Sequence, residues 1–451
     1  MRTMKTQVCV LGAGAGGTGC TYRLIKNGIK TVVVDKNPDF GGTMVFSGVD
    51  GWEPGVSLDG MHLLLKDELE KMNGGHTIGG VPNFNIFDSS VGDDWKYHSL
   101  EKYPMYYLMN TGRRYENTLA RCKLLNANGW GRFQFDPDCM RKAIHNVMES
   151  YKENLTSLFG YRFKSCTKCG DKINSIVVSE NGSDVEIFAD YFVDATGDIL
   201  LARNAGCEYA FGTEGKDECY EPSADVRSDI INGVSYIFRI SKSPDHDHID
   251  DVPDDVAGID ISDWTSERMK QTVCYCAQYP DGDINMNMLP TMEGKEYFNY
   301  GDNADKIGKA RVWAYWNYLQ REKKMKGWYL KKIYDAGIRE GYRLKGKYVL
   351  TEQDLREGVL KQPKIGRTIA IADHAMDVHG EGSMDKELDI PYEIPLECAM
   401  PKEFSNLFVA CRGASFSHVA ASSARLTRTM LSMGEGIGEY LAEKINIVVP
   451  H

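Results

Sequence analysis

Three glycines near the start of the chain have the spacing of a phosphate-binding turn. Gly12, Gly14 and Gly17 fit the pattern G-x-G-x-x-G within "VLGAGAGGTGC". The first glycine permits a tight turn, the second lets the backbone approach a pyrophosphate, and the third lets a following helix pack closely. The free N–H groups at the start of that helix attract the phosphates. We therefore expect Ala15 and Gly16 to contribute to the same site.

The flanking residues predict a β-α-β unit around this turn. Residues 7–11 are apolar and predict a buried strand, a helix is expected over residues 16–26, and "KTVVVDK" predicts a second strand. That strand ends at Asp35, where an acid can accept hydrogen bonds from ribose hydroxyls, with Lys36 beside it. The alternative is a glycine-rich turn without a ligand. The complete unit within about 30 residues favours a bound dinucleotide.

A second pair of glycines indicates which dinucleotide binds. Gly41 and Gly42 follow Asp35 by six and seven residues in "DKNPDFGGT". A nicotinamide-binding domain has no need of glycines there, whereas a flavin enzyme uses them to bring the chain close to the phosphates and ribityl chain. The sequence therefore predicts FAD, with Gly41, Gly42 and Thr43 in its site.

Two later stretches carry a resemblance to a known family. "YFVDATGDILLARNAG" (191–206) predicts an apolar strand ending in Ala-Thr-Gly-Asp, and residues 406–445 predict a strand, a polar loop and a glycine-dotted helix. With the N-terminal glycines and the segments 133–150, 339–355 and 376–382, they resemble the FAD-dependent oxidoreductase family. The resemblance is to its glutathione-reductase-like FAD fold, in a bacterial branch.

This resemblance implies further cofactor contacts. The Ala-Thr-Gly-Asp residues would lie near the cofactor's phosphates, and the strand near Thr167 would pass the adenine. The last helix would point its positive N-terminal end at the flavin's pyrimidine, stabilising the charge of the reduced ring. Cys411 replaces a usual glycine and Arg428 a usual proline, while Arg425 would either contact the flavin or brace the helix start. The residues added to the site are Thr167, Ala195, Thr196, Gly197, Asp198, Arg412, Arg425 and Thr427.

The predicted fold class is α/β, with a Rossmann-like FAD/NAD(P)-binding domain, a β-meander and an inserted α+β substrate domain. The FAD domain is expected to be discontinuous, and Asp136-Pro137 predicts the start of a helix that runs to about Asn154. Apolar residues at helical spacing in 304–325 predict a core helix. The predicted divisions are 1–60, 120–215 and 395–451 for the FAD domain, and 61–119 and 216–394 for the substrate or cap domain.

Four side chains are candidates for the chemistry beside the flavin. His418 lies in the loop before the last expected helix, and an imidazole can exchange a proton near neutral pH. His379 is a loop histidine with Asp377 two residues earlier. Arg339 and Arg343 are four apart on an expected helix and could grip a carboxylate or sugar hydroxyls. The alternatives are that both histidines only order their loops and that the arginines form a surface salt-bridge pair.

Two neighbouring classes of flavoenzyme do not match the sequence. A disulfide reductase needs a cysteine pair soon after the first β-α-β unit, but no cysteine lies between Cys20 and Cys122. "GEGIG" (434–438) lies inside the last expected helix and is not a second dinucleotide fingerprint. We expect an FAD-dependent oxidoreductase that transfers a hydride between flavin and a small polar organic substrate. The alternatives are a flavin monooxygenase-like enzyme and a flavin-binding protein without turnover.

Composition excludes several other functions. The chain has 451 residues and a net charge of −11, and this acid excess argues against a nucleic-acid partner. The start of the chain leads directly into a strand and no stretch has the roughly 20 apolar residues of a membrane span. Twelve scattered cysteines suit a reduced compartment and predict no metal site. We expect a cytoplasmic protein, and the composition is compatible with an oligomer.

Overall fold

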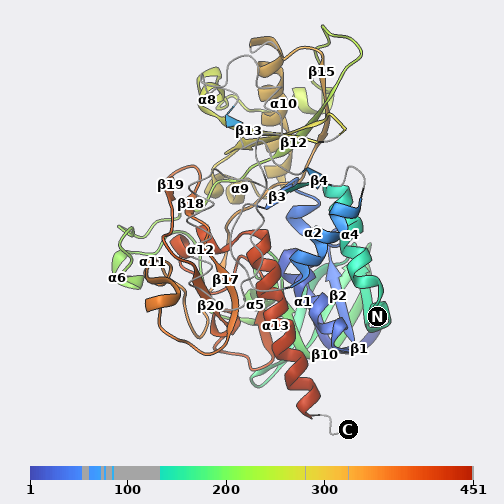
Figure 1. Cartoon of the computed structure of the whole chain (residues 1–451), viewed down its shortest axis with the longest axis vertical. Coiled ribbons are helices and arrows are strands. Elements are labelled where there is room, and N and C mark those ends of the chain that lie inside the picture. The colour runs from blue at the N-terminus through green and yellow to red at the C-terminus, as the bar shows by residue number, and fades with distance from the viewer. Residues whose placement is uncertain are drawn as a thin grey trace.

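The computed structural model describes residues 1–52, 60–72, 76–77, 84–85, 133–279, 281–322 and 325–448. Most of the substrate segment expected at 61–119 lies outside these ranges, as does the start of the segment expected at 120–215. Figure 1 shows two lobes, one built around β1, β2, β10 and α13 and the other around β12, β13, β15 and α10.

The first lobe contains a seven-stranded sheet whose centre is parallel. β1 pairs in parallel with β2 and with β10, β7 extends the sheet beyond β2, and β21 pairs with the end of β10. Residues 8–11 and 32–34 are buried apolar runs, as parallel strands covered on both faces require. The predicted Rossmann-like α/β fold is confirmed. The strands are β1 (Arg2–Leu11), β2 (Thr31–Asp35), β7 (Leu155–Phe159), β8 (Arg162–Cys169), β9 (Lys172–Glu180), β10 (Ser183–Asp194) and β21 (Leu407–Val409).

The predicted β-meander is formed by β8, β9 and β10, which pair antiparallel. The turn between β9 and β10 consists of Asn181 and Gly182, with φ values of 48° and 83°. Two successive positive φ values are typical of a two-residue type I′ turn, whose twist matches that of the strands it joins. The Asn-Gly pair therefore sets the register of the meander.

Helices of the first lobe begin where the sequence carries start signals. Asp136 caps α4 by accepting hydrogen bonds from two backbone N–H groups of its first turn, with Pro137 at the first position, as predicted. α4 ends at Glu149 rather than near Asn154, and a short 3-10 turn follows. No helix in the described ranges is long and apolar enough to cross a membrane. The helices are α1 (Ala15–Lys26), α2 (Met61–Lys71), α4 (Pro137–Glu149), α5 (Leu200–Ala205), α11 (Glu352–Lys361), α12 (His418–Ala424) and α13 (Thr427–Val448).

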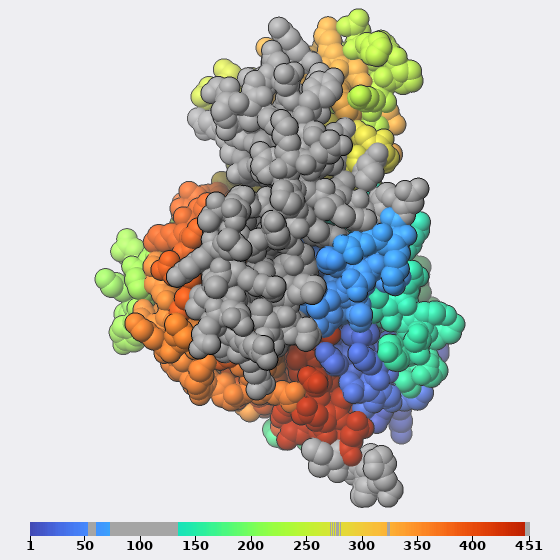
Figure 2. Space-filling model, viewed as in Figure 1, coloured from blue at the N-terminus to red at the C-terminus, as the bar shows by residue number. Residues whose placement is uncertain are grey.

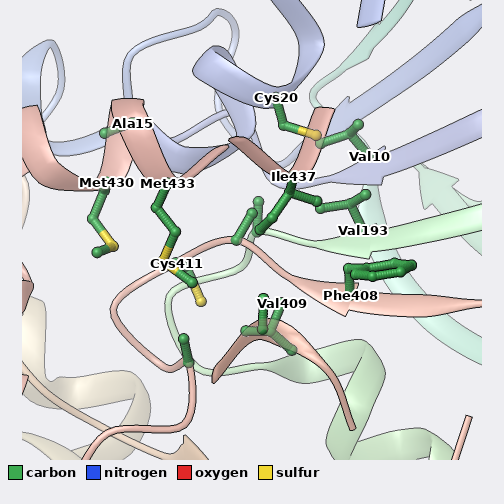
Figure 3. Close-up of a cluster of buried hydrophobic side chains, with 14 of the residues drawn as sticks. Val10, Ala15, Cys20, Val193, Phe408, Val409, Cys411, Met430, Met433 and Ile437 are labelled. Atoms are coloured by element: carbon green, nitrogen blue, oxygen red, sulfur yellow. The ribbon is translucent and has the colours of Figure 1, made fainter. Parts of the chain in front are cut away.

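α1 and α13 cross with their backbones in contact. A side chain on Gly434 would overlap the carbonyl oxygen of Gly16, and a side chain on Gly16 would overlap the carbonyl oxygen of Ala410. Figure 3 shows Ile437 of α13 beside Val10 in the core that this crossing covers. Figure 2 shows the blue N-terminal elements and the red C-terminal helix adjoining on one face. "GEGIG" is thus a helix-packing segment inside α13.

The second lobe has its own antiparallel sheet and its own core. The strand order is β15-β12-β14-β13-β5. Val312, Trp316 and Leu319 of α10 are buried in this core, so the apolar side chains in 304–325 form core contacts as predicted. The elements are β5 (Phe84–Asn85), β12 (Ile237–Lys242), β13 (Val273–Gln278), β14 (Ile284–Leu289), β15 (Trp328–Ile333), α7 (Asp254–Ala257), α8 (Ser266–Gln271), α9 (Gly294–Tyr300) and α10 (Ala304–Glu322).

The residues that make up each hydrophobic core favour a second unit that is shorter than the predicted cap segment 216–394. The buried residues of the second core run from Val234 to Trp328, whereas Leu355 and Ile394 belong to the first core. The division of the chain into domains nevertheless stays a prediction. The remaining strands and helices are β3 (Gly51–Trp52), β4 (His76–Thr77), β6 (Phe133–Phe135), β11 (Tyr209–Ala210), α6 (Lys216–Cys219), β16 (Arg343–Leu344), β17 (Thr368–Ala372), β18 (Met376–Val378), β19 (Met384–Lys386) and β20 (Tyr392–Pro395).

A buried ion cluster joins the two lobes. Arg239 on β12 donates to Asp136, the capping residue of α4, at 2.7 Å. The same guanidinium donates to Asp283 at 2.6 Å and to Asp281 at 2.7 Å, and it lies 4.3 Å from the ring centre of Tyr279. A planar guanidinium with three carboxylate partners has a fixed orientation. Arg239 therefore fixes the position of the second sheet relative to the first lobe.

Replacing Gly434 by alanine should destabilise the protein and weaken FAD binding. The added methyl group would overlap the carbonyl oxygen of Gly16 and force α13 away from α1. We expect a loss of about 1–3 kcal/mol in the free energy of unfolding, measured by urea titration. Gly258→Ala is the matched control, since its φ is −89° and no atom lies within 4 Å of the new methyl. Equal unfolding midpoints for the two variants would contradict the contact.

Glu435 makes stability depend on pH. Its carboxylate on α13 accepts from the N–H of Met61 at 2.8 Å, and burial raises its pKa from 4.5 to about 7. The folded state therefore keeps a proton that the unfolded chain has lost between these pH values, so stability falls as pH rises through this window, by roughly 3 kcal/mol.

Glu435→Gln should remove this fall in stability, because the amide is neutral at every pH and its oxygen can still accept from Met61. The measurement is the unfolding midpoint of wild type and variant at several pH values. Glu443→Gln serves as the control, since Glu443 lies on the same helix but is exposed and paired with Arg367. A stability of Glu435→Gln relative to wild type that does not increase with pH would refute the raised pKa of Glu435.

Candidate active site

The turn between β1 and α1 is tightly packed at Gly12 and open at Gly14. Gly12 has φ 107°, and a side chain there would come within 2.5 Å of the backbone of Ala195. Gly14 has φ −66°, and no atom lies within 4 Å of the place where its side chain would be. The first turn of α1 has neither a side-chain cap nor an acidic residue. Its N–H groups, on Ala15 to Gly17, are therefore available to an anion.

The second pair of glycines lies directly on this turn, as the sequence predicts for a cofactor-binding segment. Gly41 donates its backbone N–H to the carbonyl of Ala13 at 2.8 Å. Gly42 has φ 49°, and a side chain there would come within 2.6 Å of the Cα of Gly14. The chain then forms a 3-10 turn (Gly42–Met44) that includes Thr43. The two glycine segments thus form one surface.

Asp35 lies at the end of β2 and contacts the same turn. Its carboxylate accepts from the N–H of Ala13 at 2.5 Å and from the N–H of Asn37 at 2.7 Å. Burial raises the pKa of Asp35, although these hydrogen bonds oppose the shift. β7 pairs with β2 so that Phe159 lies opposite Asp35, and the N–H of Gly160 bonds to the carbonyl of Asn37 at 3.2 Å. Lys36, next in the chain, is exposed.

Thr167 is the predicted cofactor residue that the structure separates from Asp35. It is exposed on β8, where its hydroxyl bonds to Ser175 at 2.7 Å and accepts from Asn174 at 3.2 Å. Three strands lie between β8 and β2 in the sheet. The segment beside Asp35 is instead the turn that follows β7.

The Ala-Thr-Gly-Asp segment closes the turn from the other side. Ala195 donates to the carbonyl of Leu11 at 2.7 Å. Asp194, which precedes it, accepts from the N–H and hydroxyl of Thr196, and burial raises its pKa to about 6. Gly197 leaves room for the guanidinium of Arg412, which reaches Asp198 at 3.4 Å. These predicted residues, from distant parts of the sequence, are therefore neighbours.

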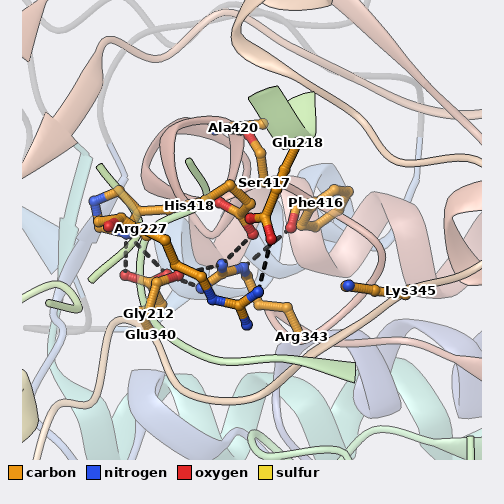
Figure 4. Close-up of polar contacts among 12 residues, drawn as sticks. Gly212, Glu218, Arg227, Glu340, Arg343, Lys345, Phe416, Ser417, His418 and Ala420 are labelled. Atoms are coloured by element: carbon orange, nitrogen blue, oxygen red, sulfur yellow. Dashed lines mark hydrogen bonds and ion pairs between the residues drawn. The ribbon is translucent and has the colours of Figure 1, made fainter. Parts of the chain in front are cut away.

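His418 forms a buried pair with Glu340. The sequence places His418 in a loop, but it is the first residue of α12, which Ser417 caps. Its Nδ1 lies 2.9 Å from Oε2 of Glu340 and 3.0 Å from Oε1, as Figure 4 shows. Burial would raise the pKa of Glu340, but His418 and Arg343 outweigh it and lower the pKa. The ionised carboxylate assigns the proton to Nδ1, and Nε2, which has no hydrogen bond to the described residues, can accept one.

Arg343 does not lie where the sequence analysis expects it. Residues 339–343 do not form a helix, and Arg343 begins the short strand β16, fully buried. Its guanidinium contacts Glu340 and Glu214 and donates to the carbonyls of Phe416 and Gly212. With these donors in use, Arg343 positions Glu340 and thereby His418, so the expected grip on a substrate and the surface salt-bridge pair are both corrected.

A second histidine–carboxylate pair lies close by. His379 Nε2 is 2.9 Å from Oδ2 of Asp377, which also accepts from Arg425 at 2.9 Å. Burial would raise the pKa of Asp377, but the hydrogen bond with His379 and the charge of Arg425 hold it well below its usual range. Burial lowers the pKa of His379 and, together with repulsion from Arg339 and Arg425, outweighs the opposing hydrogen bond with Asp377. His379 is therefore a neutral hydrogen-bonding group at neutral pH.

Asn232 connects the two pairs. Its backbone N–H donates to Oε2 of Glu340 at 2.8 Å. Its side chain donates to the carbonyl of Asp377 at 2.9 Å and accepts from the N–H of His379 at 3.0 Å. One buried asparagine thus places both histidines in a single polar site. Sequence analysis missed Asn232 and Glu340, and only the position of Glu340 next to Arg339 pointed to it.

No group of three or more metal-binding side chains occurs in the part of the chain that the structure describes. The candidate functional groups described above are the glycine turn and the two histidine pairs. A family model described as FAD dependent oxidoreductase matches residues 7–446. The chain belongs to the FAD-dependent oxidoreductase family. FAD is accordingly the cofactor of this oxidoreductase, while the glutathione-reductase-like subtype stays a prediction.

Individual relatives of this FAD-dependent oxidoreductase are distant. The small chain of glutamate synthase [NADPH] from Halomonas elongata is 48% identical over 40 residues, which are 9% of this chain and 8% of that protein. A geranylgeranyl bacteriochlorophyll reductase-like protein from Thermoplasma acidophilum is 11% identical, with a TM-score of 0.47. The match covers 99% of this chain and 80% of that protein's chain. The anhydrotetracycline hydroxylase OxyS from Streptomyces rimosus is 10% identical, with a TM-score of 0.48, and the match covers 99% of this chain and 64% of the OxyS chain.

The observed turn fits the pyrophosphate of FAD. Gly14 leaves an open space in front of the uncapped first turn of α1, and a side chain there would enter that space. Gly42 brings the backbone of the second glycine segment to the same place. A pyrophosphate needs both close backbone approach and N–H donors, and this turn supplies them.

Gly14→Ala should separate flavin binding from folding in this FAD-dependent oxidoreductase. Its φ suits alanine and its side-chain direction is free, so the apoprotein should unfold at the wild-type temperature. The methyl group would occupy space needed by the pyrophosphate, and we expect FAD affinity to fall about tenfold or more, measured by fluorescence titration. Gly12→Ala is the contrasting variant, because it should lower stability itself. Wild-type FAD affinity for Gly14→Ala would exclude this location.

Proposed function

We propose that this FAD-dependent oxidoreductase exchanges a hydride with a small polar organic substrate, with His418 as the acid or base. The observation that supports this proposal best is the buried pair of His418 and Glu340. A carboxylate on Nδ1 fixes the tautomer and orientation of an imidazole and leaves Nε2 to handle the proton. When bound, FAD supplies the redox chemistry through its flavin ring.

The cofactor would be bound by backbone and small residues rather than by large side chains. Gly14 and the first turn of α1 would contact the pyrophosphate, and Asp35 the ribose. The turn at Phe159–Gly160, rather than Thr167, would border the adenosine, because it lies beside Asp35. Arg412 and Thr427 would contribute from the C-terminal part of the chain, where α13 begins without an acidic residue in its first turn.

Three residues divide the proton chemistry between them. His418 would take a proton from, or give one to, the substrate at Nε2. Glu340 acts as a positioning residue, because its carboxylate bonds to Nδ1 of His418 and acts on the substrate only by orienting that imidazole. Arg343 holds that carboxylate ionised from the far side. An ionised Glu340 also stabilises the protonated imidazole that forms when His418 acts as a base.

The first experiment is a visible spectrum of the purified protein, followed by anaerobic mixing with polyols, hydroxy acids and unsaturated acids. We expect a flavin absorbance band at about 450 nm that at least one class of organic donor bleaches. Bleaching of this band by NAD(P)H alone would favour a monooxygenase-like reaction. A bound flavin that nothing bleaches would instead indicate a protein without turnover, and either result would overturn the proposal.

His418→Gln should slow the bleaching of bound flavin by the identified donor about 100-fold or more. The bleaching rates of wild type and variant are compared over a range of pH. Glu340→Gln should lower the rate and shift the pH profile, which a purely structural role would not do. His248→Gln is the control, because this histidine pairs with Asp250 in the second lobe. A His418→Gln enzyme whose flavin is bleached at the wild-type rate and with the wild-type pH profile would exclude His418 as the acid or base.

A further inference from the structure

Arg339 lies in the candidate site without a carboxylate of its own. Its Nη1 donates to the carbonyl of Gly233 at 3.0 Å and to the hydroxyl of Ser235 at 2.9 Å. Neither partner carries a charge, and no ion pair joins Arg339 to any residue in the described ranges. Nε and Nη2 make no hydrogen bond to the same residues. Burial together with the charge of Arg425 lowers the pKa of Arg339, as expected for a guanidinium that lacks a counter-ion.

Arg339 belongs to the same polar site as the two histidine pairs. Gly233, which accepts from Arg339, donates its own N–H to the carbonyl of His379 at 2.8 Å. The next residue along the chain from Arg339 is Glu340, the partner of His418. Arg339 is therefore linked to the His379 pair through Gly233 and to the His418 pair through Glu340.

The charges around Asp377 leave one guanidinium without a counter-ion. Arg339 and Arg425 both carry a positively charged guanidinium. Asp377 is ionised and pairs with Arg425, while His379 is neutral. The neighbouring acid Glu340 is already paired with His418 and Arg343. Arg425 also keeps its buried Nε without a hydrogen-bond partner. These two arginines therefore offer unused donors to an anion.

We infer that Arg339 and Arg425 bind a carboxylate group of the substrate. The inference rests on the proposed function, since it names the substrate class of the same site. A guanidinium presents paired N–H donors whose geometry matches a carboxylate, which makes this match stronger than one with neutral hydroxyls. The substrate would then be an organic acid, oriented by its carboxylate so that the reacting carbon lies toward His418.

The test is titration of the FAD-loaded protein with three acids and their neutral amides at constant ionic strength. The pairs are acetate and acetamide, glycolate and glycolamide, and succinate and succinamide. Binding is followed by the difference spectrum of the flavin and, in the same samples, by the thermal unfolding temperature. For wild type we expect at least one acid to bind with a Kd in the millimolar range or tighter, and its amide at least about tenfold more weakly.

Arg339→Gln should weaken binding of that acid about tenfold or more while leaving FAD affinity and amide binding unchanged. Arg339→Lys keeps the charge without the paired donors and should lose less of the affinity for that acid. This second variant keeps the test informative if the glutamine variant does not fold. Arg367→Gln, at a half-buried arginine paired with Glu443 outside the site, is the matched control and should behave as wild type.

Three results would overturn the inference. The first is wild-type protein that binds none of the acids up to about 50 mM. The second is Arg339→Gln protein that binds them normally. The third is a loss of FAD affinity as large as the loss of acid affinity, because these arginines would then serve the cofactor. Each differs from failure of the proposed function, in which donors do not bleach the flavin or His418→Gln reacts normally.

Discussion

The contact between α1 and α13 is the constraint on which the rest of this structure depends. Gly16 lies against Gly434 on one side and against the carbonyl of Ala410 on the other, with backbone touching backbone. The same residue belongs to the first turn of α1, where the N–H groups are free for the cofactor. The helix that binds phosphate is therefore positioned by main-chain contacts from the far end of the chain, and a close-packed interior leaves no room for larger residues there.

The polar site uses burial to fix protonation states. Glu340 is kept ionised by His418 and Arg343, whereas burial leaves His379 neutral beside an ionised Asp377. In both histidine–carboxylate pairs, a histidine and an arginine thus keep the carboxylate ionised against the effect of burial. In a low-dielectric interior, such neighbours decide the charge of a group more strongly than they would in water. Asn232 keeps the two pairs in register, since it bonds to both.

Local signals in the sequence predicted the elements that contain them. The glycine turn and the Asp136-Pro137 helix start depend on backbone rules that act over a few residues, and both form as expected. Residues brought together over long distances were harder to predict. Arg343 has helical spacing from Arg339, yet it begins a short strand that pairs with β11, and it forms an ion pair with Glu214 from a distant segment.

Strand order shows the same limit within the sheet. It decides which strand lies beside Asp35, and no local signal encodes that order. The role of Thr167 in the cofactor site stays a prediction. The partner of His418, and the residue that links the two histidine pairs, were hidden for a related reason. Glu340 and Asn232 lie in different segments, so their role depends on tertiary packing. The chemical types in the site could be predicted from the sequence, whereas most of the pairing could not.

The joining of β1 and α1 to α13 has a consequence for biosynthesis. A growing chain makes the glycine turn first and the helix that covers it more than 400 residues later. Until α13 emerges from the ribosome, the face of α1 around Gly16 and Cys20 has no partner and exposes apolar surface. A domain whose early and late elements pack together cannot complete folding before the later element is made. We therefore expect cofactor loading to follow the synthesis of α13.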